Sequence, residues 1–222
     1  SHALIIGAGG LGSPVGLYLA SAGVGRITVV DNDTVDRTNL QRQIIHTMDR
    51  VGQAKALSAR VAMQAINPHA TVTPVVARAD DALLDELVAH AAVVLDCCDN
   101  FVTRHAINKA CVKHRKPLVS GAVIRFDGQV CVYDPRCPDS PCYACLFPPD
   151  SDHQETNCAT MGVFGPLVGI IGSLQAAEAL KLLSGAGRPL TGRLLMLDGR
   201  SMEFTQVKIA RQAACVVCGN TS

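Results

Sequence analysis

The sequence of 222 residues contains no tryptophan, few other aromatic residues and almost no net charge. Aromatic residues make up 4 % of the chain, so aliphatic side chains must fill the core. The formal net charge of +1 gives no electrostatic reason to expect nucleic acid or an acidic membrane as a partner. No uninterrupted apolar run reaches the roughly 18 residues of a membrane span, and no signal peptide precedes the first apolar segment. These absences favour a cytoplasmic protein that binds neither nucleic acid nor a membrane.

Cysteine, in contrast, is abundant, with ten residues in the chain. Four of them form two Cys-x-x-Cys pairs, Cys142 with Cys145 and Cys215 with Cys218. Two such pairs are the usual ligand set of a structural four-thiolate zinc site. Disulfides or redox-active thiols are the alternatives, but a redox Cys-x-x-Cys normally occurs once, near the start of a helix. We therefore expect zinc to tie the end of the chain to its middle in a reducing compartment.

Strand-like and helix-like segments alternate along the first half of the chain. The patterns predict strands at 3–6, 26–30, 71–76, 93–96 and 118–120, and helices at 14–22, 53–66, 81–90 and 101–114. The second half predicts a strand or hairpin at 123–133 with a turn at Asp127-Gly128, a helix at 166–183, and a hairpin formed by 194–197 and 202–208. This order predicts a single α/β domain over 1–222, a Rossmann-like, doubly wound, mostly parallel sheet extended by antiparallel C-terminal strands.

A glycine-rich segment follows the first predicted strand. Gly7, Gly9 and Gly12 form Gly-x-Gly-x-x-Gly between a strand and a helix, the context in which this motif binds a nucleotide. Glycines let the backbone approach phosphates at a helix N-terminus, where free N–H groups and the helix dipole favour anions. Ser13 is the expected N-cap of that helix, and Asp31, after the second strand, is placed to bind ribose hydroxyls. A tight turn without a ligand is the alternative, and the motif alone does not separate NAD from ATP.

Charged residues in the following loops favour a nucleotide triphosphate. Arg42 lies shortly after the second strand and Lys55 begins a predicted helix, so both would neutralise phosphates and transition-state charge. Asp99 and Asn100 follow the fourth strand, at the edge where open α/β sheets bind ligands. Asp99 would hold Mg²⁺ there. The alternatives are a solvated basic surface for the two cations and helix capping for Asp99 or Asn100.

An ordered set of motifs resembles the ThiF/MoeB family, bacterial relatives of the ubiquitin-activating enzymes. The matching segments are Gly-Ala-Gly-Gly-Leu-Gly at 7–12, Asp-Asn-Asp at 31–33, Asn-Leu-Gln-Arg-Gln at 39–43, Gly-Gln-Ala-Lys at 52–55, Asp-Cys-Cys-Asp-Asn at 96–100, both Cys-x-x-Cys pairs, and Asn157-Cys158. The resemblance spans the whole chain. It implies ATP- and Mg²⁺-dependent adenylation of the C-terminal Gly-Gly carboxylate of a ubiquitin-like sulfur-carrier protein of the ThiS or MoaD type, for thiamine or molybdopterin synthesis.

The resemblance also implies roles for individual residues. The ATP site would comprise Gly7, Gly9, Gly10, Gly12, Asp31, Asn39, Arg42, Gln43, Lys55, Asp99 and Asn100, within a nucleotide-binding half at 1–121. The half at 122–222 would bind the carrier and, through the four paired cysteines, structural zinc. The family also has an N-terminal helical segment whose Arg reaches the ATP phosphates of the partner subunit. This sequence begins at Ser1, directly before the first strand, so that segment is not among its residues.

Cys158 is the one further cysteine with an expected chemical role. In the family, a cysteine at this place forms a thioester or acyl disulfide with the carrier or a sulfur donor. An acyl adenylate is a reactive mixed anhydride, and a thiolate is a suitable nucleophile for it. The alternative is a spare surface thiol, and no role is expected for Cys137.

The apolar helix at 166–183 bears on the oligomeric state. A helix that is apolar on nearly every face must be buried on more than one side, so a symmetric homodimer is expected. Burial within one chain is the alternative. Two rival functions are an NAD-dependent oxidoreductase, which leaves Arg42, Lys55 and the paired cysteines unexplained, and a non-catalytic nucleotide-binding scaffold.

Overall fold

A computed structural model describes residues 1–149 and 162–219 of the chain. The strands are β1 (His2–Ile6), β2 (Arg26–Val30), β3 (Thr71–Val75), β4 (Val93–Asp96), β5 (Leu118–Ile124), β6 (Asp127–Tyr133), β7 (Arg193–Asp198) and β8 (Glu203–Lys208). The helices are α1 (Gly12–Ser21), α2 (Lys55–Ile66), α3 (Asp81–His90), α4 (Phe101–Lys113), α5 (Tyr143–Leu146) and α7 (Gly165–Ser184), and short 3-10 turns lie at Arg37–Asn39 and Met48–Arg50.

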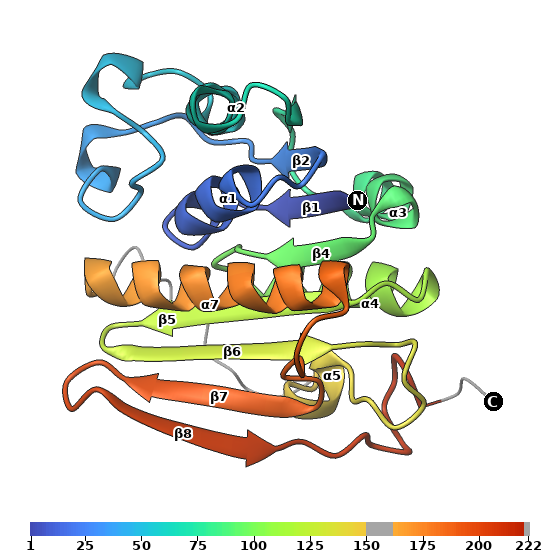
Figure 1. Ribbon diagram of the computed structural model, residues 1–222. Coiled ribbons are helices and arrows are strands. Elements are labelled where there is room, and N and C mark those ends of the chain that lie inside the picture. Colours follow the sequence, from blue (N-terminus) through green and yellow to red (C-terminus); the bar gives the residue numbers. More distant parts are fainter. Residues whose placement is uncertain (150–161, 220–222) are drawn as a thin grey trace.

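All eight strands form one sheet in the order β3-β2-β1-β4-β5-β6-β7-β8 (Figure 1). Strands β1 to β5 pair in parallel, and β6, β7 and β8 continue the sheet antiparallel. The order reverses direction between β1 and β4, as it does at the ligand-binding edge of doubly wound folds. The predicted α/β class, with a mostly parallel sheet and an antiparallel C-terminal extension, is confirmed. Since β5 runs through residue 121, the two predicted halves share one sheet.

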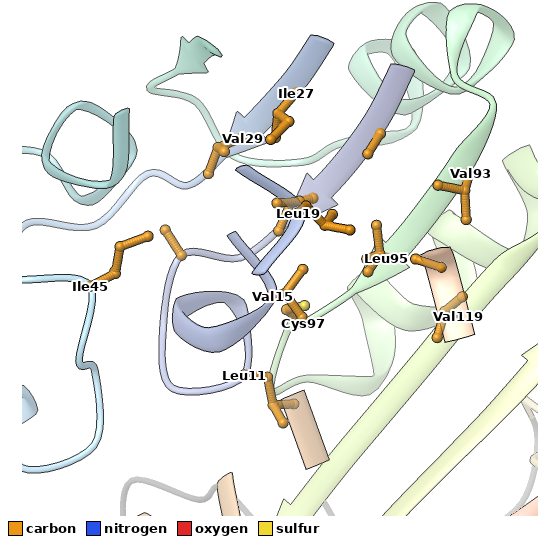
Figure 2. Packing of buried hydrophobic residues seen from close by; sticks show 14 of the residues in the cluster. Leu11, Val15, Leu19, Ile27, Val29, Ile45, Val93, Leu95, Cys97 and Val119 are labelled. Carbon is orange, nitrogen blue, oxygen red and sulfur yellow. The ribbon is translucent and has the colours of Figure 1, made fainter. Parts of the chain in front are cut away.

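Apolar side chains cover both faces of the sheet. Alternate residues of β1 divide between two clusters: Ile5 packs with α1, α2 and α7, and Leu4 packs with α3 and α4. Figure 2 shows part of the first cluster, including Val15 and Leu19 of α1, Ile27 and Val29 of β2, and Val93 and Leu95 of β4. Burial on both faces explains why the parallel strands are almost continuously apolar. The polar residues that follow these strands lie at one edge of the sheet.

The hairpin between β5 and β6 turns earlier than predicted. Ile124 pairs with Asp127, so Arg125 and Phe126 form the turn and Arg125 takes a φ of +53°. The prediction of a turn at Asp127-Gly128 is therefore wrong. Gly128 lies within β6, where a Cβ atom would stand 2.7 Å from the side chain of Ile171. This glycine serves the close approach of α7 to the sheet and not the turn.

The long helix α7 lies across the sheet over β4, β5 and β6 and packs against α1 (Figure 1). By length and composition alone, α7 is apolar enough to cross a membrane. The search for an uninterrupted apolar run in the sequence did not detect it, because its glycines, serines and Gln175 interrupt the run while they lower its mean hydropathy only a little. In the fold, Gln175 is fully buried and donates hydrogen bonds to the carbonyls of Asp96 and Val119. α7 is thus a core helix that is hydrogen-bonded to the backbone of β4 and β5.

Candidate functional site

A cleft opens where β1, β2 and β4 end, at the reversal of strand order. Its volume is about 220 Å³. The lining includes most of the predicted ATP-site residues, namely Gly7, Gly9, Gly10, Asp31, Arg42, Gln43, Lys55, Asp99 and Asn100. Gly12 and Asn39 do not line it. The fold thus gathers residues from five separate sequence motifs around one cavity.

The glycines of the loop serve different purposes. Gly7 has a φ of +100°, and a Cβ atom on Gly12 would lie 2.0 Å from the carbonyl oxygen of Gly7, so both are needed to close the loop. Gly9 is different, because a Cβ there would lie 3.6 Å from its nearest neighbour, an ordinary contact with the side chain of Gln43. Protein packing does not require a glycine at this position. Its missing side chain leaves space at the cleft wall for a ligand.

The helix after the loop starts without a side-chain cap. Ser13 was expected to cap α1, but α1 begins at Gly12 after Leu11, and no side chain caps it. The Ser13 hydroxyl instead donates a 2.6 Å hydrogen bond to the carbonyl of Gly9, within the loop. The helix starts earlier than predicted, at Gly12, so Ser13 lies inside its first turn. The N–H of Ser13 donates to the carbonyl of Gly9 at 3.0 Å and Pro14 has no N–H, so an anion in the cleft would meet the N–H groups of the loop before Ser13.

Asp31 is tied to the loop from the end of β2. Its carboxylate accepts hydrogen bonds from the backbone N–H of Ala8 at 2.7 Å and of Asp33 at 2.8 Å. Burial raises the pKa of Asp31, while these two bonds and the nearby charge of Lys55 oppose the rise. The carboxylate is thus held at the cleft wall, where its free lone pairs can accept from hydroxyl groups.

Two cationic side chains, Lys55 and Arg42, line the cleft. The ammonium of Lys55 lies 2.9 Å from the carboxylate of Asp33, and the Lys55 side chain is 8 % exposed while that of Asp33 is 60 % exposed. Arg42 is half-buried and lines the same cleft. Gln43 is buried, and its Oε1 atom is the one buried side-chain oxygen or nitrogen of the described residues without a hydrogen-bond partner. An unsatisfied buried acceptor is costly, so a ligand donor in the cleft would relieve it.

Asp99 and Asn100 differ in their local roles. The side chain of Asn100 accepts a 2.9 Å hydrogen bond from the N–H of Thr103 and so caps α4, one of the alternatives open from the sequence. Asp99 is exposed and lines the cleft. Arg104 lies behind this loop and donates hydrogen bonds to the carboxylate of Asp96 at 3.0 Å and to the carbonyl of Cys98 at 2.6 Å. Its position one turn into α4 gave no sequence signal for this role.

His46 is a second residue that the sequence did not single out. Its ring is buried, and Nε2 donates to the carbonyl of Ala8 at 2.9 Å while Nδ1 accepts from the hydroxyl of Ser58 at 2.8 Å. Burial lowers the pKa of His46, as do the charges of Lys55 and Arg50. A neutral imidazole therefore binds the carbonyl of Ala8 in the glycine loop, while the carboxylate of Asp31 binds the N–H of the same residue.

A second, more apolar cavity adjoins the cleft. Its volume is about 420 Å³, and it shares Asp99, Asn100, Arg104 and Val123 with the cleft. The rest of its wall comes from Phe101 of α4, from β5 to β8 and from the region of α5. We call this cavity the groove. It runs from the polar cleft along the antiparallel part of the sheet, so an extended ligand lying in it would present one end to the cleft.

The four paired cysteines lie together at the far end of the sheet from the cleft strands. Their sulfur atoms are all within 4.8 Å of one another. Cys142 Sγ lies 3.6 Å from that of Cys215, and Cys145 Sγ lies 3.4 Å from that of Cys218. In a tetrahedral site with Zn–S bonds of about 2.3 Å, neighbouring sulfurs are about 3.8 Å apart. All four thiols are free, so the donor set and its spacing fit zinc and not two disulfides.

The thiols of this cluster differ in acidity. Burial raises the pKa of Cys142 and of Cys218. Burial also opposes ionisation of Cys215, but hydrogen bonds from the N–H groups of Cys218 and Val217 lower its pKa to about 7. A metal must displace the protons of the other thiols. Of the remaining cysteines, Cys137 is exposed, and Cys158 lies outside the described residues.

Residues 1–217 match the ThiF family. The chain belongs to the ThiF family. It is 48 % identical over 219 residues to molybdopterin-synthase adenylyltransferase of Escherichia coli K12, a match that covers 99 % of this chain and 87 % of that protein. It is 43 % identical over 222 residues to the sulfur carrier protein ThiS adenylyltransferase of the same organism, covering 100 % and 87 %. The family membership expected from the motifs is confirmed, and these relatives are named as adenylyltransferases.

A further relative and a solved structure are also similar to this chain. The SAMP-activating enzyme E1 of Haloferax volcanii is 46 % identical over 220 residues, which cover 99 % of this chain and 80 % of that protein. The crystal structure of E. coli MccB with ATP superposes with a TM-score of 0.86 at 24 % identity, covering 99 % of this chain and 66 % of that one. At that identity the structural likeness shows a shared fold.

Proposed function

We propose that this protein is an adenylyltransferase that uses ATP and Mg²⁺ to activate the C-terminal Gly-Gly carboxylate of a small ubiquitin-like sulfur carrier of the ThiS or MoaD type. The observation that carries the proposal is the continuity of two cavities, a polar cleft with a glycine loop and an apolar groove that ends at it. In this reaction the carboxylate attacks the α-phosphorus of ATP, pyrophosphate leaves, and an acyl adenylate remains. The reaction would supply sulfur transfer in thiamine or molybdopterin synthesis.

The residues of the cleft suit such a nucleotide. The N–H groups of the glycine loop before Ser13 and the space at Gly9 would receive phosphates. Arg42 and Lys55 would stabilise charge that develops as pyrophosphate departs. The carboxylate of Asp31 would accept from ribose hydroxyls. Asp99 would hold Mg²⁺, which when bound neutralises phosphate charge.

The groove suits a narrow, extended protein tail. Its walls near the cleft are Ala122, Val123 and Gly128, which are small or β-branched and leave a confined channel. A Gly-Gly terminus has no side chains to exclude from such a channel, so its carboxylate would reach the α-phosphate. Cys158 would then take the acyl group as a thioester and release AMP. A separate sulfur-donor protein would act after that step.

A homodimer is proposed as the working form, in the cytoplasm. The outer face of α7 and the neighbouring α1 line a shallow apolar depression, and Tyr18, Ile44 and Ile66 around it are 54 %, 60 % and 48 % exposed. Gly169 has no neighbour within 4 Å of a Cβ position, so its face is open. A second copy would bury this surface. Light scattering at micromolar concentration should give twice the chain mass, and a monomer mass would contradict this part.

The proposal is tested by ATP–pyrophosphate exchange. Exchange should require both Mg²⁺ and an added ThiS- or MoaD-type carrier, and it should be lost with a carrier lacking its terminal Gly-Gly. Exchange in the absence of any carrier, or none with either carrier, would contradict the proposal. Nucleotide binding without exchange would favour a non-catalytic scaffold, and binding of NAD in preference to ATP would favour an oxidoreductase.

A further inference from the structure

The four-cysteine cluster and the groove share one short element, α5. Cys142 is the N-cap residue of α5 and Cys145 lies within it, so α5 and its cap carry two of the four thiols of the cluster. Tyr143, its first residue, and Phe147, just after its end, line the groove. One short stretch of chain therefore contributes both to the proposed metal site and to the wall of the proposed carrier site.

α5 cannot be stable by itself. It comprises four residues, and its closing hydrogen bonds run from the N–H of Cys145 to the carbonyl of Cys142 and from the N–H of Phe147 to the carbonyl of Tyr143, each 3.0 Å long. A single helical turn has an unfavourable nucleation free energy and needs external contacts to persist. A metal bound by Cys142, Cys145 and the C-terminal pair would supply them, because it fixes both ends of the turn to another segment.

Asn108 on α4 connects the thiols to the groove wall. Its Oδ1 accepts a 2.9 Å hydrogen bond from the N–H of Tyr143, and its Nδ2 donates to the sulfur of Cys142 at 3.6 Å. The residue is 1 % exposed, so neither bond competes with bulk water. A metal-bound thiolate is a better acceptor than a thiol. Loading the cluster therefore strengthens the contact that orients the first turn of α5.

The aromatic rings extend this order into the groove. The ring of Tyr143 lies 4.9 Å from that of Phe147 and 6.0 Å, edge to face, from that of Tyr133. His105 of α4 meets Tyr143 at 5.2 Å. Aromatic packing at these separations fixes ring positions. Movement of α5 would therefore displace Phe147 and Tyr143 together and change the shape of the groove.

We propose that metal in the four-cysteine cluster positions Tyr143 and Phe147 as the aromatic wall that contacts the carrier tail. This inference rests on the proposed function, and it gives the metal a part in carrier affinity besides joining the two ends of the fold. The cleft residues lie on other elements, so nucleotide affinity should not depend on the metal in the same way. Tyr143 and Phe147 are positioning and recognition residues, and neither takes part in the chemistry.

The first test compares zinc-loaded and metal-free full-length protein by hydrogen exchange, which needs no carrier. Without metal, the amides of Cys145 and Phe147 should lose protection, while those of β1 keep theirs. The variant Asn108→Leu keeps all four thiols and should bind zinc at the wild-type ratio yet show the same local loss. Lys109→Leu, an exposed neighbour on α4, is the matched control. Unchanged protection of α5 in both the metal-free protein and Asn108→Leu would overturn the inference.

The second test measures affinity for purified ThiS- and MoaD-type carriers and for ATP by calorimetry. Metal removal and Asn108→Leu should each weaken carrier binding at least tenfold while ATP affinity stays within twofold. Equal carrier affinity, or equal losses for carrier and ATP, would overturn the inference. If the zinc-loaded wild type binds neither carrier, the proposed function is wrong, whereas the exchange experiment still decides whether metal orders α5.

Discussion

Lys55→Met separates a role in catalysis from a role in folding. The substitution removes the ammonium but keeps an unbranched side chain, which preserves the buried stem of a residue that is 8 % exposed. Its partner Asp33 is 60 % exposed and returns to solvent when the pair is broken. A pair of this kind contributes about 0–1 kcal/mol to stability. The unfolding free energy should therefore change little.

The same ammonium should matter far more to the reaction. A charge directed at developing negative charge in a site shielded from water contributes about 2.7–4 kcal/mol, so the rate of adenylation should fall on the order of 10²–10³-fold. ATP–pyrophosphate exchange at saturating ATP and carrier measures this loss, and thermal unfolding measures stability. Lys109→Met removes an exposed ammonium at the distant end of α4 and should leave both unchanged. Exchange near the wild-type rate in Lys55→Met, or a large loss of stability, would refute the reasoning.

Four further outcomes are expected. Protein purified without added zinc should contain about one zinc per chain, and Cys215→Ser should lose it; a metal content near zero in the wild type would contradict the assignment. Asp31→Ala should raise the KM for ATP more than it lowers kcat, since ribose contacts change little between ground and transition states; steady-state kinetics decides this. Since burial lowers the pKa of His46 from 6.5, stability should be full above that pH and decline as pH falls below it, and His46→Gln should flatten the decline in unfolding midpoints. Cys158→Ser should retain pyrophosphate exchange but lose any covalent carrier adduct; loss of exchange would place the residue in the adenylation step instead.

Features that follow from a periodic apolar pattern or from a motif of specific residue types could be predicted from the sequence. Alternating apolar segments predicted the parallel sheet, because buried strands and amphipathic helices have distinct periods. The two Cys-x-x-Cys pairs predicted the four-sulfur cluster, because ligand spacing is set by metal geometry. The motifs were also sufficient to place most cleft residues together, since parallel strands end at one edge.

The sequence did not predict features that depend on tertiary packing. Asp127-Gly128 resembles a turn, yet Gly128 is required by the approach of Ile171 across the sheet. Ser13 resembles an N-cap, yet its hydroxyl bonds to the carbonyl of Gly9 because the helix starts two residues earlier than predicted. His46 and Arg104 act through contacts with residues distant in the chain. No local pattern encodes such contacts.

The most direct test of the proposed activity is intact-mass analysis of the carrier after incubation with this protein, ATP and Mg²⁺. We predict that a ThiS- or MoaD-type carrier gains the mass of one adenylyl group at its C-terminus, that added pyrophosphate reverses the gain, and that a carrier without its Gly-Gly terminus gains nothing. An unmodified carrier at full zinc occupancy, or modification that is independent of the Gly-Gly terminus, would contradict the account.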